Sequence, residues 1–138
     1  MKIVMVSGGF DPLHPGHLAY FSAAKRLGDV LCVAVDNDEY VAKKHKVLLE
    51  QSKRLKVVRA LSLVDFAVLC PFGLSVAPCI EMVRPDIYAV GRHYKQHTIE
   101  ILPEYDTCQR LNIPIVPVAH DDDSSSSDIL RGFTGAIR

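Results

Sequence analysis

The chain has 138 residues, of which 49% are hydrophobic and 23% are charged, and we expect a single domain spanning residues 1–138. The 16 Lys and Arg residues balance the 16 Asp and Glu residues, so the net charge is zero. This balance argues against general binding of nucleic acid or of a membrane surface, and we expect neither as a partner. It is compatible with local positive charge that serves a small anionic substrate.

Apolar segments alternate along the chain with segments of helical spacing. The predicted strands are residues 2–6, 30–35, 66–70, 87–90 and 113–119. The predicted helices are residues 18–27, 52–63, 75–83 and 98–111, with a short helix and a basic loop in 40–50 and a short last helix from residue 128. Pro103 must lie in the first turn of its helix or mark a kink, and the prolines of the fifth strand place that strand near a sheet edge.

This alternation predicts βαβ units with right-handed crossovers. The first two strands are apolar at nearly every position, as strands buried on both faces are. We therefore expect an α/β fold, a three-layer α/β/α Rossmann-like domain with a doubly wound parallel sheet of about five strands.

The cysteines and the start of the chain bear on the cellular compartment. Cys32, Cys70, Cys79 and Cys108 form no C-x-x-C pair, and the first two lie in apolar strands. We expect reduced thiols in a cytoplasmic protein rather than disulfides or a zinc site. Met1 leads directly into a strand and no apolar run is long enough to span a bilayer, so we expect neither a signal peptide nor a membrane span.

The segment from Gly8 to His17 carries the strongest functional signal. It lies between a strand and a helix and begins with two glycines, which let the backbone approach a ligand closely. The N-terminus of a helix offers unpaired N–H groups and a positive dipole end, so the segment predicts an anion site, most naturally for phosphate. His14 and His17, spaced His-Pro-Gly-His, lie at the same place.

Two charged groups follow the second predicted strand. Asp36 and Asp38 lie at its carboxyl end, where they either cap a helix or reach a metal or a substrate. Lys43, Lys44 and Lys46 come next, and they form either a solvated basic face or a clamp for phosphates.

The Gly-rich turn also carries a family resemblance. Gly9-Phe10-Asp11-x-x-His14-x-Gly16-His17 resembles the signature of the HxGH nucleotidyltransferases, the cytidylyltransferase-like enzymes. Later blocks match in chain order: the basic loop with Lys44 and Lys46, Arg54, Arg84-Pro85-Asp86, and Ser125-Ser126-Ser127-Asp128-Ile129. The subgroup that the chain resembles includes heptose-phosphate adenylyltransferases, glycerol-3-phosphate and phosphoethanolamine cytidylyltransferases, and archaeal FAD synthetase.

The resemblance implies transfer of NMP from an NTP to a phosphorylated acceptor, with release of pyrophosphate. The acceptor phosphate is already a nucleophile at neutral pH, so the protein has to align two anions and neutralise charge. On this view the catalytic residues are His14 and His17, which contact the α-phosphate and the bridging oxygen, and Lys46. The alternative is that one histidine is a structural cap. Mg²⁺ is expected to accompany the NTP.

The remaining expected contacts surround the histidines. Backbone N–H groups of Ser7, Gly8, Gly9 and Phe10 line the nucleotide cleft, and Gly16 is also expected to bind the nucleotide. Lys44 binds phosphate, while Asp38 and Arg54 bind the substrate. The residues with a second interpretation are Asp11, which either orients a histidine or holds the turn, and Phe10, whose ring we expect in the core.

Two later blocks bear on the nucleotide. Gly91 and Arg92 are expected to contact it, although His93 stands where many relatives carry an acid. Ser125, Ser126 and Ser127 either close on the β- and γ-phosphates from a helix N-terminus or belong to a flexible tail. CTP-using relatives often carry Arg-Thr-x-Gly ahead of this block, where this chain has residues 120–123, reading His-Asp-Asp-Asp.

We therefore expect a nucleotidyltransferase that uses ATP or CTP, with ATP favoured, and that has a sugar or polyol phosphate as acceptor. The resemblance also implies a homodimer. The competing hypothesis is a nucleotide-binding regulatory domain that has lost turnover, because the loop at residues 91–94 and the acidic stretch at 121–123 both depart from the family pattern.

Overall fold

The computed structural model describes residues 1–91, 99–100 and 102–118. The strands are β1 (Ile3–Gly8), β2 (Val30–Val35), β3 (Phe66–Leu69), β4 (Ile87–Gly91) and β5 (Ile115–Val118). The helices are α1 (Pro15–Lys25), α2 (Asp38–Ala42), α3 (Gln51–Arg59), α4 (Ala77–Val83) and α6 (Tyr105–Arg110). In the described part of the chain the strands form one parallel sheet in the order β3-β2-β1-β4-β5.

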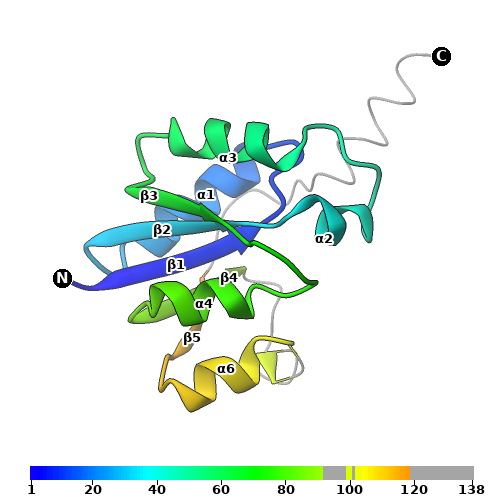
Figure 1. Cartoon of the computed structure of the whole chain (residues 1–138). Helices are drawn as coiled ribbons and strands as arrows, with labels where there is room; N and C mark the ends of the chain where they lie inside the picture. Colours follow the sequence, from blue (N-terminus) through cyan, green and yellow to red (C-terminus); the bar gives the residue numbers. More distant parts are fainter. Residues whose placement is uncertain (92–98, 101, 119–138) are drawn as a thin grey trace.

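Helices cover both faces of this sheet (Figure 1). Val4 and Val6 of β1 pack with α1 and α3 on what we call the α1–α3 face. Met5 of β1 and Tyr88 of β4 pack with α4 and α6 on the α4–α6 face. Successive side chains of a strand point to opposite faces, so one apolar strand supplies both layers of the core. The predicted three-layer α/β/α fold is confirmed.

The order of the strands reverses between β1 and β4. From β1 the chain runs outward through β2 and β3, then crosses back to add β4 and β5 on the other side. Such a switch point leaves a crevice at the carboxyl ends of the strands, where ligands bind in open α/β sheets. Gly8 at the end of β1 is paired with Val35 of β2, so the predicted Gly-rich turn begins at this edge.

Several element ends differ from prediction. The helix expected at residues 18–27 begins at Pro15, because His14 caps it and proline is favoured in a first turn. The helix expected at 98–111 is shorter, since residues 102–104 form a turn and α6 begins at Tyr105. Pro103 therefore precedes the helix and does not kink it. The prediction that the fifth strand lies at an edge is confirmed.

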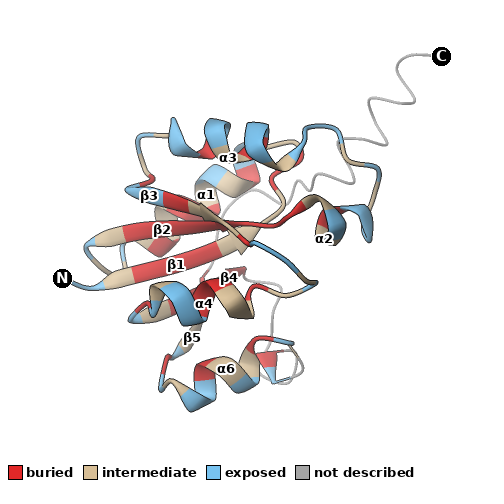
Figure 2. Cartoon of the chain, in the orientation of Figure 1, coloured by how far each residue is buried: buried red, intermediate tan, exposed pale blue. Residues whose placement is uncertain are grey.

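The sheet is the most buried part of the molecule, while the helices expose their outer faces (Figure 2). The four cysteines are buried free thiols: Cys32, Cys70, Cys79 and Cys108. Cys79 donates a hydrogen bond to Cys70, with 2.9 Å between the sulfur atoms. Among the residues with described positions, none belongs to a helix long and apolar enough to cross a membrane.

Candidate active site

The turn after β1 is shaped by close packing. A side chain at Gly8 would meet the ring of Phe10, because a Cβ there would lie 2.8 Å from Phe10 Cε1. Phe10 itself has a φ of 54°, and its ring packs edge-on against His17 and Phe21. Phe10 is buried, which confirms that its ring belongs to the core. The Phe10 ring therefore supports one side of the His17 ring.

Both histidines are anchored by backbone groups at the start of α1. His14 is the N-cap, and its Nδ1 accepts a hydrogen bond from Gly16 N at 3.0 Å. His17 Nδ1 accepts from His14 N at 3.2 Å, which completes a capping box. The two rings stack with their centroids 3.7 Å apart. A neutral imidazole whose Nδ1 accepts carries its proton on Nε2, so each ring is arranged to donate through Nε2.

Asp11 connects this turn to the basic loop. Its carboxylate is buried and accepts hydrogen bonds from Leu48 N at 2.7 Å and Leu49 N at 2.9 Å. These bonds agree with the second role considered for Asp11, which is to hold the turn. Because Lys44 and Lys46 lie in the same loop a few residues earlier, Asp11 ties them to the histidine turn.

Arg54 lies completely buried behind the turn, and each of its described bonds goes to protein. Its Nε donates to Leu49 O at 2.8 Å, and its Nη1 donates to both Gly9 O and Asp36 O at 2.7 Å. Its Nη2 forms an ion pair with Asp38 Oδ1 at 2.7 Å. The two residues predicted to bind substrate are therefore brought together, and in this structure they bind each other.

The polar residues that follow β2 have different surroundings. Asn37 is the N-cap of α2, since its Oδ1 accepts from Tyr40 N at 2.8 Å. Asp36 is buried, and this burial raises its pKa to about 6, although the positive charges of Lys44 and Arg54 act in the opposite direction. Lys44 is exposed, with its ammonium 4.9 Å from the centre of the Tyr40 ring.

A chain of hydrogen bonds that the sequence did not reveal lies on the α4–α6 face. The Ser7 Oγ and Tyr88 hydroxyl oxygen are 2.7 Å apart, and the Tyr88 hydroxyl donates to Glu104 Oε1 at 3.1 Å. Tyr88 has a single hydroxyl proton, so Ser7 is the donor in the first bond. Glu104 is buried, and this burial raises its pKa. The sequence places Tyr88 in a predicted strand and Glu104 in a predicted helix, and no local pattern indicates that their side chains form part of a site.

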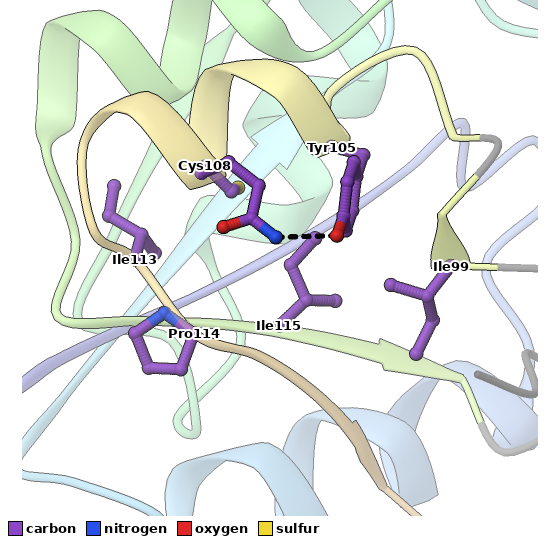
Figure 3. Close-up of a pocket in the computed structure, with 7 residues that line it drawn as sticks. Ile99, Tyr105, Cys108, Ile113, Pro114 and Ile115 are labelled. Carbon is purple, nitrogen blue, oxygen red and sulfur yellow. Dashed lines mark hydrogen bonds between the residues drawn. The ribbon is translucent and has the colours of Figure 1, made fainter. Parts of the chain in front are cut away.

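A separate groove lies between α6 and β5 (Figure 3) and has a volume of about 160 Å³. Gln109, which helps to line the groove, donates a hydrogen bond to the Tyr105 hydroxyl. Its lining residues are Ile99, Tyr105, Cys108, Gln109, Ile113, Pro114 and Ile115. None of them is a predicted site residue, so this groove is distinct from the carboxyl edge of the sheet.

The described site residues gather at that carboxyl edge. They are Ser7, Gly8, Gly9 and Phe10 at the end of β1, His14, Gly16 and His17 at the start of α1, Asp38, Lys44 and Lys46 after β2, Arg54 in α3, and Gly91 at the end of β4. The predictions for Arg92 and for Ser125, Ser126 and Ser127, like the departures at His93 and residues 120–123, lie outside the described residues.

Comparisons with known proteins identify relatives of this chain. The FAD synthase of Archaeoglobus profundus is 34% identical over 142 residues, which cover 100% of this chain and 90% of the relative. The FAD synthase of Ferroglobus placidus is 41% identical over 97 residues, covering 70% of this chain. The bifunctional protein HldE of Desulfatibacillum aliphaticivorans is 32% identical over 94% of this chain. This chain spans 62% of the Ferroglobus relative and 26% of HldE.

A solved structure and a family model complete the comparison. The crystal structure of the lipopolysaccharide core biosynthesis protein from Thermoplasma volcanium GSS1 superposes with a TM-score of 0.73 at 31% identity, covering 88% of this chain and 99% of that one. The model of the cytidylyltransferase-like family matches residues 5–132. The resemblance drawn from the HxGH turn is thus confirmed, and the chain belongs to the cytidylyltransferase-like family of nucleotidyltransferases.

Proposed function

We propose that this chain transfers AMP from ATP to the phosphate of a small-molecule acceptor and releases pyrophosphate. The observation that carries the proposal is the stacked pair His14 and His17, whose Nδ1 atoms are both held by backbone N–H groups at the start of α1. An oxygen of the acceptor phosphate attacks the α-phosphorus of ATP. The bond from the α-phosphorus to the bridging oxygen breaks, and that oxygen leaves with the pyrophosphate.

Each histidine has a defined part in this reaction. Donation from Nε2 to the α-phosphate and to the bridging oxygen stabilises the charge that develops as the bond breaks. The start of α1 adds the positive end of a helix dipole. Lys44 and Lys46 are proposed to hold the phosphates, because Asp11 binds their loop to the histidine turn.

Arg54 is proposed to act as a positioning residue. Its guanidinium donates to backbone oxygens at the ends of β1 and β2, and Asp38 completes the arrangement. These bonds fix the strand ends from which the turn and the basic loop depart. A side chain engaged in this way supports the site from behind and leaves the phosphate contacts to the histidines and lysines.

Mg²⁺ is expected to enter with the triphosphate, where it neutralises charge on the departing pyrophosphate. Among residues 1–91, 99–100 and 102–118, no group of three or more His, Cys, Asp or Glu side chains is arranged to hold a metal ion. A magnesium ion carried by phosphate oxygens and water needs few protein ligands. This arrangement is the one we propose here.

Riboflavin phosphate is the first candidate acceptor. The relative from Archaeoglobus profundus that aligns with the whole chain is an FAD synthase, and FAD is AMP joined to riboflavin phosphate. The phosphate of that acceptor stands on a ribityl chain that carries a flavin ring, so it differs from the simple sugar or polyol phosphate that the sequence suggested. A sugar phosphate is the second candidate, because HldE and the lipopolysaccharide core biosynthesis protein are also similar to this chain.

The test is an assay of pyrophosphate release. The purified protein is incubated with Mg²⁺, with ATP or CTP, and with riboflavin phosphate or a heptose phosphate, and the conjugate is identified by mass spectrometry. We expect pyrophosphate and an AMP conjugate from ATP with one of these acceptors. Nucleotide binding by calorimetry without pyrophosphate from any pair would support the regulatory hypothesis instead. The homodimer stays a prediction, and light scattering coupled to gel filtration tests it.

A further inference from the structure

Glu104 holds an unpaired acceptor in a buried position. The residue is 6% exposed, and its Oε1 accepts from the Tyr88 hydroxyl. Its Oε2 has no hydrogen-bond partner among the described residues. Buried polar atoms are nearly always paired, because burial removes the water that would otherwise bind them. An orphaned carboxylate oxygen therefore points to a partner that arrives with a ligand.

Glu104 lies at the same edge of the sheet as the candidate active site. Tyr88 joins it to Ser7 Oγ, and Ser7 directly precedes Gly8, where the turn to the histidines begins. Electrostatic effects link Glu104 to the basic loop. Burial raises the pKa of Glu104 and of Asp36, and the positive charge of Lys44 lowers both pKa values. The Glu104 carboxylate therefore lies within electrostatic range of Lys44 in the basic loop.

The chain of hydroxyl groups also fixes the orientation of the carboxylate. Ser7 donates to Tyr88, and Tyr88, which is 2% exposed, donates to Glu104 Oε1. With Oε1 held in this way, the direction of Oε2 is set before any ligand binds. A preorganised acceptor of this kind selects for ligands that present an O–H or N–H donor.

The chemistry of the site indicates which substrate supplies that donor. A carboxylate repels phosphate, so Glu104 faces a part of a substrate that carries no phosphate. In-line displacement puts the attacking and leaving oxygens on opposite sides of the phosphorus. In the proposed reaction the histidines at the start of α1 contact the leaving side, so we place the acceptor on the opposite side of the phosphorus, toward the α4–α6 face on which Tyr88 packs.

We propose that Glu104 is a specificity-determining residue whose Oε2 accepts a hydrogen bond from an O–H or N–H group in the non-phosphate part of the acceptor. This inference rests on the proposed nucleotidyl transfer and adds a feature of the acceptor to it. In riboflavin phosphate the donor is a ribityl hydroxyl or the ring N–H, and in a heptose phosphate it is a sugar hydroxyl.

The test compares Glu104→Gln with a matched variant on the same face. Glu104→Gln keeps the shape of the side chain but replaces one acceptor oxygen by a donor. Glu81→Gln removes the same charge from α4, where the exposed Glu81 pairs with Arg110. We expect Glu104→Gln to raise KM for the acceptor by about 10- to 100-fold, the effect of losing a hydrogen bond to a charged group, with KM for ATP and kcat within about twofold of wild type. Glu81→Gln should leave all three constants unchanged.

Direct binding provides a readout without turnover. Calorimetric titration with riboflavin phosphate or the heptose phosphate, in the absence of ATP, should show weaker binding to Glu104→Gln by the same factor. An acceptor analogue that lacks the relevant O–H or N–H group should bind wild type equally weakly and should not distinguish wild type from the variant. If Glu104→Gln does not fold, Glu104→Asp, which withdraws the oxygen by one methylene, takes its place.

The outcomes separate this inference from the proposed function. Unchanged acceptor affinity in the variant, or a loss of ATP affinity instead, contradicts the role of Glu104 even if wild type releases pyrophosphate. A wild-type protein that binds neither acceptor also overturns the inference. Nucleotidyl transfer itself fails only if wild type releases no pyrophosphate with any nucleotide and acceptor.

Discussion

At the carboxyl edge of the sheet, the buried polar side chains of the two faces differ in how fully they are hydrogen-bonded. On the α1–α3 face, Asp11 receives two backbone N–H groups, Arg54 donates to three carbonyl oxygens and to Asp38, and both histidines accept from the backbone. On the α4–α6 face, one oxygen of Glu104 accepts from Tyr88, and the other has no partner in the described part of the chain.

The first set of groups is held by hydrogen bonds within the protein, whereas Glu104 keeps one acceptor available for a ligand. Groups whose hydrogen bonds are all internal keep their geometry without a ligand, and this is what a reaction that depends on alignment requires. A buried group with an unused bond is stabilised when a ligand supplies the partner. We therefore assign the proposed catalytic groups to the α1–α3 face and selection of the acceptor to the α4–α6 face.

The largest effect should follow from breaking the buried support at Arg54. Arg54→Met leaves three carbonyl oxygens and the Asp38 carboxylate without their donor, and we expect a loss of about 3–5 kcal/mol in the free energy of unfolding, measured by urea denaturation. Arg59→Met on the same helix is the control, because Arg59 is exposed and makes only long bonds to Ala67 O. It should lose less than about 1 kcal/mol. Equal losses in the two variants would show that burial of Arg54 gives it no special role.

The next largest effect concerns His14, where capping and catalysis can be separated. His14→Ala removes both the cap and the Nε2 donor, so we expect kcat to fall by about 10²- to 10³-fold and stability to fall by about 1 kcal/mol. His14→Asn retains a side-chain acceptor for Gly16 N, and asparagine is a favoured N-cap. It should restore the stability without restoring kcat. Recovery of turnover in His14→Asn would mean that the histidine serves only as a cap. Pyrophosphate release and thermal unfolding measure the two quantities.

A smaller effect is expected at Asp36, where the substitution should stabilise the protein rather than destabilise it. Burial raises its pKa from the usual 3.8 to about 6, so the folded state binds the proton more tightly than the unfolded state does. Stability therefore falls as the pH rises from about 4 to about 6, by about 2–3 kcal/mol in total. Asp36→Asn should raise the free energy of unfolding at pH 7.5 and have little effect at pH 3.5, as determined by thermal unfolding across this range.

Asp65 provides the control of opposite sign. Hydrogen bonds from Lys25 and from Leu31 N lower its pKa, so its contribution to stability is present at neutral pH and is lost as the pH falls through the lowered pKa. Asp65→Asn should thus be destabilising at pH 7.5 and nearly neutral in strong acid. The same pH response in Asp36→Asn and Asp65→Asn would contradict the assignment for Asp36.

The smallest predicted effect tests the tie between the turn and the basic loop. Asp11→Asn keeps one acceptor oxygen but turns an amide toward the second backbone N–H, so the loop that carries Lys44 and Lys46 should loosen. We expect KM for ATP to rise by about 3- to 10-fold, with a smaller change in kcat, in steady-state assays. Asp29→Asn, at an exposed carboxylate that accepts from Lys2 N, should leave KM unchanged. A uniform loss of kcat without a change in KM would argue against a role through the loop.

Much of the fold could be predicted because its signals are local. The apolar runs of β1 and β2 mark strands buried on both faces, and the alternation with helices implies a parallel sheet. The ends of helices were less predictable, since capping by His14 moved the start of α1 to Pro15 and the turn at residues 102–104 delayed α6. Propensity does not reveal which side chain will serve as a cap.

The candidate site was predictable in part. The strand, the glycines and the histidine spacing all lie within one short stretch of chain, so the sequence alone predicts a phosphate site there. Arg54 was expected to contact substrate, yet its described partners include Gly9, which is 45 residues away along the chain. Tyr88 and Ser7 are 81 residues apart and also meet only in the fold.

The sequence by itself determined the order of the elements, the parallel sheet and the position of the histidine turn, because these follow from hydrophobic spacing and from the conformational freedom of glycine over a few residues. Only the tertiary structure decided which buried polar groups of the described residues are paired and which are not. Pairing depends on the switch in strand order between β1 and β4, which brings Ser7, Tyr88 and Glu104 together. Glu104 Oε2 is buried without a partner among the described residues because of this long-range packing. No local pattern of residues predicts it.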